Sequence, residues 1–271
     1  MLLNKLASGI RRRSRTAAAR ISLSLRRKIS GRPVWFDNGR IKLPFHGDGD
    51  DQEIYYKLDG RAWWDKELGL ISPYLKAGDV AVDVGANHGF MSGVFSTLIG
   101  STGQIHSFEP NPKVFAKLLE VIQVNNLSTV SAYNMGCGKE AQSMTLFCPP
   151  SSGHASLRPN SDIERSTLEK KEVRIVKLDD FLGPKLERLN FLKIDTEGYE
   201  EDVLLGATEL IHRFHPVIYI ELCSEYLASS ERAIQILLDL GYTFDRKPDM
   251  SHSSNGDNFF ALPPNYYQRT N

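Results

Sequence analysis

Residues 80–89 read Val80-Ala81-Val82-Asp83-Val84-Gly85-Ala86-Asn87-His88-Gly89. The β-branched and small residues at the start of this stretch are typical of a buried strand in a parallel sheet. Gly85 and Gly89 predict a tight turn, because glycine lets the backbone approach a ligand closely. The apolar residues after them predict a helix over residues 90–99. The stretch therefore predicts the strand, turn and helix with which α/β proteins bind nucleotide-type cofactors.

A second predicted strand, residues 104–108, is followed by the acid Glu109. A carboxylate at this position can accept hydrogen bonds from ribose hydroxyls. A dinucleotide fingerprint would need glycine at position 87, where this chain has Asn87. The Asn87 side chain would crowd the pyrophosphate of a dinucleotide. A ligand without phosphate tolerates this side chain and can bind the strand-end acid Asp83 instead. The pattern favours S-adenosylmethionine; a turn that binds no ligand is the alternative.

Three blocks of sequence resemble the FkbM family of S-adenosylmethionine-dependent methyltransferases. They are Asp83-Val84-Gly85-Ala86-Asn87-His88-Gly89, then Phe108-Glu109-Pro110-Asn111-Pro112, then Leu192-Lys193-Ile194-Asp195-Thr196-Glu197-Gly198-Tyr199-Glu200. The resemblance covers residues 80–222 and implies the class I methyltransferase fold, a Rossmann-like, doubly wound α/β sheet of seven strands with the last strand antiparallel. It also implies S-adenosylmethionine as cofactor and a hydroxyl of a sugar, a glycolipid or a secondary metabolite as acceptor.

The residues expected to bind the cofactor lie at or just after the ends of the first three predicted strands. They are Asp83, Gly85, Ala86, Asn87, Gly89, Glu109, Asn111 and Cys137. Asn111 is also a candidate cap for the helix that starts at Pro112. Cys137 ends a predicted strand over residues 130–137, where class I methyltransferases place small groups near the adenine. A purely apolar, buried role is the alternative for this cysteine.

The predicted catalytic residues lie in, or just after, two later buried strands, residues 191–195 and 217–222. They are Lys193, Asp195, Glu197 and Glu221. Lys193 and Asp195 are two residues apart, so a strand places both on one face. A lysine flanked by carboxylates can keep one of them ionised, or it can lose its proton on burial and act as the base. The sequence leaves both options open, and a purely structural ion network is a third.

The three acids Asp195, Glu197 and Glu221 would suit Mg²⁺ or Ca²⁺, which prefer carboxylate ligands. The resemblance does not require a metal ion. We therefore predict a reaction without a metal.

Charge divides the chain into two parts. Residues 1–40 hold eleven Lys or Arg and one acid, Asp37, giving +10, and the neutral total leaves −10 for residues 41–271. We expect a basic N-terminal appendage over residues 1–40, helical or disordered, and a methyltransferase domain over residues 41–271. Residues 1–30 could contact anionic membrane as a basic amphipathic helix; a disordered tail and a transit peptide are the alternatives.

The expected partner is a small-molecule or glycan acceptor. Nucleic acid is not expected, because the catalytic part is acidic and no aromatic-basic motif is present. Three cysteines without Cys-x-x-Cys spacing indicate a reducing compartment, hence the cytoplasm, with peripheral membrane contact through the leader. Residues 149–171 predict a long loop that acts as a lid or binds the acceptor. A noncatalytic adenosyl-binding assembly partner and a nucleotide-linked oxidoreductase are the alternative functions.

Overall fold

The computed structural model describes residues 34–37, 39–45, 60–149, 155–158, 166, 168–248 and 256–266. Most of the predicted basic leader and most of the predicted loop over residues 149–171 lie outside this part of the chain.

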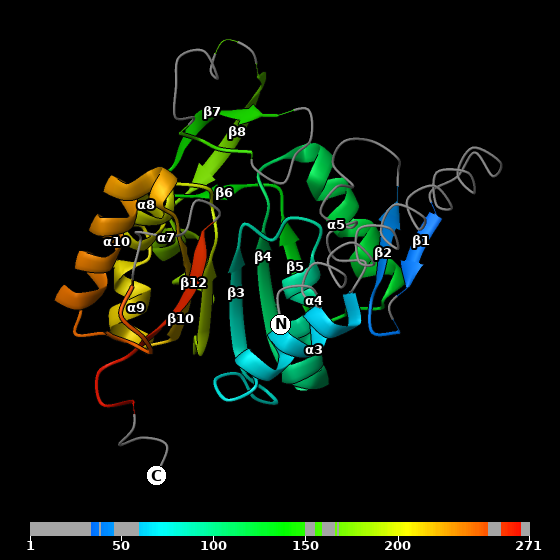
Figure 1. The fold of residues 1–271 in the computed structure, drawn as a ribbon, viewed down its shortest axis with the longest axis horizontal. Coiled ribbons are helices and arrows are strands. Elements are labelled where there is room, and N and C mark those ends of the chain that lie inside the picture. The colour runs from blue at the N-terminus through cyan, green and yellow to red at the C-terminus, as the bar shows by residue number, and fades with distance from the viewer. Residues whose placement is uncertain are drawn as a thin grey trace, which may run out of the picture.

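The described residues alternate between strands and helices along most of the chain (Figure 1). The strands are β1 (Val34–Asp37), β2 (Lys42–Phe45), β3 (Val80–Val84), β4 (Gln104–Phe108), β5 (Val130–Tyr133), β6 (Gly136–Cys137), β7 (Gln142–Cys148), β8 (Glu169–Val176), β9 (Phe191–Ile194), β10 (Val217–Leu222), β11 (Thr243–Phe244) and β12 (Asp257–Leu262). The α-helices are α3 (Gly60–Ile71), α4 (Phe90–Ile99), α5 (Pro112–Val124), α7 (Leu178–Leu182), α8 (Glu200–Leu205), α9 (Thr208–Phe214) and α10 (Leu227–Asp239).

The central sheet has seven strands in the order β11-β12-β10-β9-β3-β4-β5. Strands β3, β4, β5, β9 and β10 are parallel, and β12 runs antiparallel to both of its neighbours, β10 and β11. This is the class I methyltransferase arrangement, so the predicted fold class is confirmed. The carboxyl ends of the parallel strands therefore lie together at one edge, where α/β folds bind their ligands.

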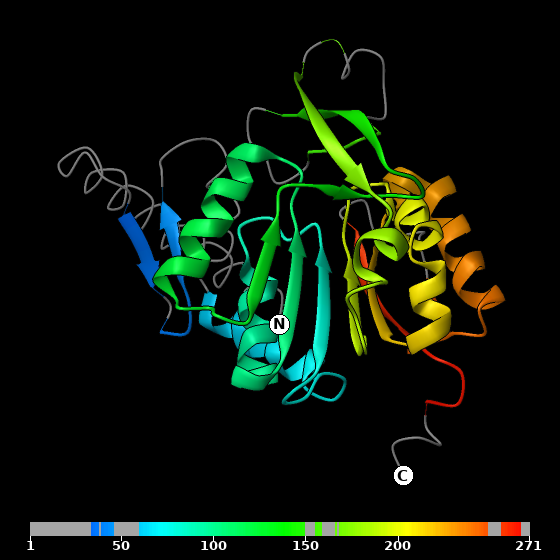
Figure 2. The same cartoon turned by 180° about the vertical axis from the view of Figure 1, so that it is seen from behind.

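Helices cover both faces of the sheet, as the two opposite views show (Figures 1 and 2). Side chains alternate between the faces along each strand. On β9, Phe191 packs edge-on against Phe95 of α4, with ring centroids 5.3 Å apart. The next residue, Leu192, belongs to the cluster on the other face together with Val203 and Leu237. Burial on both faces explains why the parallel strands read as continuous apolar runs.

A small second sheet, β6-β8-β7, stands at the carboxyl edge of the central one (Figure 1). The predicted strand over residues 130–137 is broken: β5 ends at Tyr133, and β6 pairs with β8 instead. Asn134 turns the chain there, since its Nδ2 donates to the carbonyls of Glu109 and Pro110 at 2.9 and 3.0 Å. The loop prediction was also too long, because β8 begins at Glu169, which pairs with Cys148 of β7.

The hairpin of β1 and β2 spans the position where the predicted leader ends, residue 40. It is joined to α5 by a pair of hydrogen bonds between the Lys42 backbone and the side chain of Asn125, at 2.8 and 2.9 Å. Among the helices that the structure describes, none has the length and apolar character needed to cross a bilayer.

Candidate active site

A cavity of about 570 Å³ opens at the carboxyl ends of β3, β4 and β9. Its volume is within the range of small-molecule sites. Part of its lining is apolar and consists of Val84, Phe108, Val114, Cys137 and Leu146. Another part is mostly polar and consists of Asp195, Thr196, Glu197, Glu221, Glu225 and Tyr226.

The glycine turn after β3 forms one wall of this cavity. Gly85 has a φ of 76°, and a Cβ there would lie 1.8 Å from the carbonyl oxygen of Asp195, so only glycine fits. Asn87 also has a positive φ, 49°, and its Oδ1 accepts a hydrogen bond from the His88 backbone N–H at 2.7 Å. The turn is thus held by its own side chain and closely packed against the end of β9.

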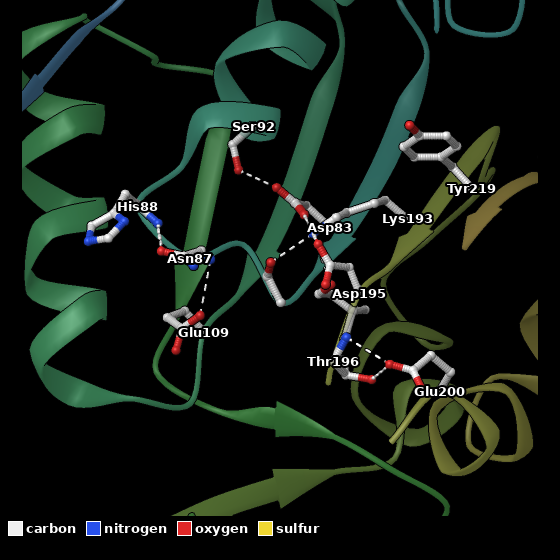
Figure 3. Close-up of polar contacts among 12 residues, drawn as sticks. Asp83, Asn87, His88, Ser92, Glu109, Lys193, Asp195, Thr196, Glu200 and Tyr219 are labelled. Carbon is white, nitrogen blue, oxygen red and sulfur yellow. Dashed lines mark hydrogen bonds and ion pairs between the residues drawn. The ribbon is translucent and has the colours of Figure 1, made fainter. Parts of the chain in front are cut away.

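Glu109 lies across from this turn (Figure 3). Its two carboxylate oxygens accept hydrogen bonds from the backbone N–H groups of Asn87, at 3.0 Å, and Asn111, at 2.8 Å. Burial raises the pKa of Glu109 to about 7, although the two backbone hydrogen bonds and Lys193 oppose the shift. Asn111 caps α5 as predicted, accepting from the Lys113 N–H at 3.1 Å. Glu109 therefore links the two loops that border the cavity.

Two predicted cofactor residues face away from the cavity. The carboxylate of Asp83 is fully buried and accepts a hydrogen bond from Ser92 Oγ at 2.6 Å (Figure 3). Gly89, with a φ of 83°, packs so closely on α5 that a Cβ there would lie 2.6 Å from Leu118 Cδ1. Cys137 does line the main cavity, and burial raises the pKa of its thiol.

Lys193 is the buried cation of the site. Its Nζ lies 3.2 Å from Asp195 Oδ2 and 3.3 Å from Asp83 Oδ1, and it donates a hydrogen bond to the carbonyl of Gly85 at 2.8 Å. Burial by itself would lower the pKa of Lys193, but the two carboxylates raise it above its ordinary value. The two carboxylates thus favour the protonated form of Lys193, which agrees with the option in which the lysine keeps a neighbouring carboxylate ionised.

Three predicted catalytic acids converge beside this lysine. Carboxylate oxygens of Asp195, Glu197 and Glu221 all lie within 4.8 Å of one another. Burial, followed by the charge of Asp195, raises the pKa of Glu221 to about 11. At neutral pH Glu221 is therefore protonated, which relieves the repulsion among the three acids.

The turn that bears Asp195 is held by Glu200, the first residue of α8. Its Oε1 accepts hydrogen bonds from the backbone N–H groups of Thr196, at 3.0 Å, and Gly198, at 3.1 Å, and from Thr196 Oγ1, at 2.9 Å (Figure 3). Glu197 within this turn adopts a φ of 54°, which is uncommon for a residue with a side chain. Glu200 therefore fixes this turn from the start of α8.

A second cavity, of about 400 Å³, meets the first one at the acids. The two share Gly85, Asn87, Asp195, Glu221 and Gly256. The sequence-predicted residues Ala86 and Lys193 line this second cavity.

Further residues around these cavities were not predicted from the sequence. Tyr219 and Glu67 line the second cavity, where the Tyr219 hydroxyl donates to Glu67 Oε2 at 3.2 Å. Ser92 supports Asp83, and Ser156 lines the main cavity. Two local signals were present. Tyr219 lies two residues before Glu221 on one strand, and Ser156 belongs to the stretch Gly153-His154-Ala155-Ser156-Leu157, which resembles a Gly-x-x-Ser-Leu pattern of the FkbM family. Glu67 is far away in sequence and gave no signal.

The family follows from comparison of the whole chain with known proteins. A family model described as "Methyltransferase FkbM domain" matches residues 83–244. The chain belongs to the FkbM methyltransferase family. The prediction from the three sequence blocks is therefore confirmed, and S-adenosylmethionine is the cofactor that this family and fold imply.

Individual relatives share between 14% and 32% sequence identity with this FkbM chain. Methyltransferase 1 of Beauveria bassiana (strain ARSEF 2860) is 32% identical over 159 residues, which make up 52% of this chain and 64% of that relative. The chain thus spans less than two thirds of the relative's length. Methyltransferase FkbM from Methylobacillus flagellatus KT has 17% identity and a TM-score of 0.47, over 69% of this chain and 43% of that one. Aeropyrum pernix fibrillarin, with natively bound S-adenosyl-L-methionine, has 14% identity and a TM-score of 0.44, over 73% of both chains.

The residues of the FkbM domain fit this cofactor. The apolar part of the lining, with Phe108 and Val114, suits an adenine ring, and the neighbouring Glu109 suits ribose hydroxyls as an acceptor. A buried acid with a pKa of about 7 is ionised in mildly alkaline solution. Asp195 and Glu197 in the polar part of the lining suit the positive charges of a sulfonium and an ammonium group.

Proposed function

We propose that this protein is an S-adenosylmethionine-dependent methyltransferase that methylates a hydroxyl oxygen of a sugar, a glycolipid or a secondary metabolite. One observation carries the proposal: the Asp195 and Glu221 carboxyls, beside the Lys193 cation, line both cavities where they meet. A cofactor in the main cavity and a hydroxyl next to it can then both reach the same acids.

The cofactor supplies an electrophilic methyl group when it is bound. The acceptor hydroxyl must lose its proton as its oxygen forms the new bond, and an aliphatic hydroxyl does so only with a base in place. Asp195 is the base in this proposal, because it lines both cavities at their junction and its Oδ2 is held 3.2 Å from the Lys193 ammonium group. The proton moves from the acceptor oxygen to the carboxylate of Asp195.

Glu221 has a different part, because it is protonated at neutral pH. It donates a hydrogen bond instead of accepting a proton, either to Asp195 or to the acceptor oxygen. Lys193, Asp83 and Glu200 contribute by fixing the positions of these acids. Positioning and a general base together account for much of the rate that such a transfer requires.

We place the protein in the cytoplasm, with residues 1–30 in contact with anionic membrane, and with a small-molecule or glycan acceptor in place of nucleic acid. The charge of +10 over residues 1–40 supports the membrane contact. Co-sedimentation with phosphatidylserine vesicles tests it: the full chain should bind, and a chain that starts at residue 41 should not.

The first experiment is a calorimetric titration of the full chain with S-adenosylmethionine, S-adenosylhomocysteine and NAD. Binding of the two adenosyl ligands and not of NAD supports the proposal, and NAD binding would favour an oxidoreductase. Transfer of a labelled methyl group to a panel of sugars, glycolipids and secondary metabolites then tests the acceptor class. Cofactor binding without turnover on any acceptor would favour a noncatalytic adenosyl-binding protein.

A further inference from the structure

Residues 155–158 cross from the small sheet to the turn that bears the acids. Backbone hydrogen bonds of 3.0 and 3.1 Å join Ser156 to Phe147 of β7, so the segment forms a further edge of this sheet. Ala155, Ser156 and Leu157 line the main cavity together with Phe147. A ligand in that cavity is therefore enclosed on this side by the segment.

Ser156 attaches the segment to the catalytic turn. Its Oγ donates a hydrogen bond to the carbonyl of Glu197 at 2.7 Å, and the serine is 4% exposed. Glu197 is the residue with the φ of 54°, a conformation that a residue with a side chain keeps only where surrounding contacts hold it. The Ser156 hydroxyl is one of those contacts, and it reaches Glu197 across 41 residues of sequence.

Arg158 makes a second attachment, to the start of α8. Its guanidinium forms a hydrogen-bonded ion pair with Asp202, lies 3.7 Å from Glu201 Oε2 and stands 5.0 Å from the centre of the Tyr199 ring. The Asp202 side chain is 3% exposed, so the pair is shielded from water on the acid's side. The Arg158 backbone N–H also donates to Ser156 Oγ at 3.0 Å, which couples the two attachments.

We propose that Ser156 and Arg158 form a clasp that closes the main cavity over the cofactor and holds Glu197 next to Asp195 and Glu221. Both are positioning residues, because they act through the turn and the wall of the cavity. The inference rests on the proposed function, since it assigns the enclosed space to the cofactor. Its consequence is kinetic: the clasp must open before the cofactor product leaves, so a weakened clasp speeds dissociation.

The test uses S-adenosylhomocysteine as the probe and stopped-flow measurement of its dissociation rate from the full chain. Arg158→Gln is expected to raise that rate at least tenfold, because it removes the ion pair with Asp202. Arg174→Gln on β8 is the matched control: Arg174 is exposed and lines neither cavity, so the rate should stay within about twofold of wild type. Thermal melting of both variants confirms that each is folded.

Substitutions of Ser156 give an independent test. Ser156→Ala should speed the dissociation of S-adenosylhomocysteine and lower kcat at an unchanged acceptor KM, because the Glu197 carbonyl loses its hydrogen bond from Ser156. Ser156→Thr keeps the hydroxyl and should restore both, which a defect of folding alone would not predict. Ser143→Ala on β7, at an exposed position, is the control that should behave as wild type.

The outcomes separate the clasp from the proposed function. Faster dissociation from Arg158→Gln and Ser156→Ala, with rescue by threonine, supports the clasp. Tight binding by wild type with unchanged dissociation in both variants overturns the clasp alone. Absence of any binding by folded wild type overturns the proposed function, and the clasp falls with it.

Discussion

Lys193 Nζ lies 3.3 Å from Asp83 Oδ1, and the two residues are direct neighbours on the adjacent parallel strands β9 and β3. Asp83 is 0% exposed, and its other carboxylate oxygen is taken by Ser92 at 2.6 Å. The acid that ends the glycine-turn strand thus holds the lysine that pairs with Asp195. Its part in the site is indirect, through a buried ion network.

Removing the lysine should destabilise the protein strongly. Lys193→Met leaves the carboxylate of Asp83 buried without its cation, and such a loss costs about 3–5 kcal/mol. Urea unfolding measures the free energy of unfolding. Adding Asp83→Asn to the same chain should recover a large part of that loss, because no buried charge then remains. Equal destabilisation of the single and double variants would contradict this account of the pair.

Asp195→Asn tests the assignment of the base. The substitution keeps the shape of the side chain and removes its ability to accept a proton, so kcat should fall by roughly 10²- to 10⁴-fold. Affinity for S-adenosylhomocysteine should change by less than about tenfold. Asp180→Asn, at a surface position on α7, is the matched control and should leave kcat unchanged. A small effect on kcat would move the role of base to another residue.

Cofactor affinity should depend on pH through Glu109. The ionised carboxylate is the form that accepts hydrogen bonds from ribose hydroxyls, and the pKa of Glu109 in the free protein is about 7. Affinity for S-adenosylhomocysteine is expected to be constant above pH 8 and to weaken toward tenfold per pH unit below about pH 6. Glu109→Gln should bind S-adenosylhomocysteine more weakly than wild type at pH 8, and its affinity should not depend on pH. The control Glu172→Gln, at an exposed position, should behave as wild type.

Glu221 should make the protein less stable as pH rises. Its pKa is raised from 4.5 to about 11 in the folded protein, so the folded state binds more protons than the unfolded chain between these values. Stability present below pH 4.5 is therefore lost progressively above it. Glu221→Gln removes the penalty and should raise Tm at pH 8 by at least roughly 2–4 °C, with little gain at pH 4.5. Glu231→Gln, at an exposed position on α10, should change Tm at neither pH.

Chelation tests the prediction of a reaction without a metal. The cation of Lys193 and the proton on Glu221 already offset the charges of the three acids. Treatment with EDTA should therefore leave both S-adenosylhomocysteine affinity and turnover within about twofold of the untreated protein. Loss of turnover that Mg²⁺ or Ca²⁺ restores would instead identify Asp195, Glu197 and Glu221 as ligands of a metal ion.

Local pattern was sufficient to predict the five parallel strands of the central sheet, apart from the end of β5. Strand β3 and α4 follow from two apolar runs, and the turn between them follows from Gly85 and Gly89. Helix α5 follows from the cap Asn111 and from Pro112 at the first helical position. The small sheet could not be predicted in this way. Strands β6 and β8 pair across a long separation, and the turn at Asn134 that separates β5 from β6 depends on contacts with Pro110.

The sequence by itself predicted the family and the fold class, through the resemblance of three blocks to known methyltransferases. It also predicted the set of acids at the ends of β9 and β10, because strand-end residues are local properties of the chain. Only the tertiary structure decided how those residues are arranged and which charges surround them. The protonation of Lys193 and Glu221 depends on burial and on charges brought together from β3, β9 and β10. The clasp of Ser156 and Arg158 likewise depends on contacts across some forty residues, and such contacts leave no periodic trace in the sequence.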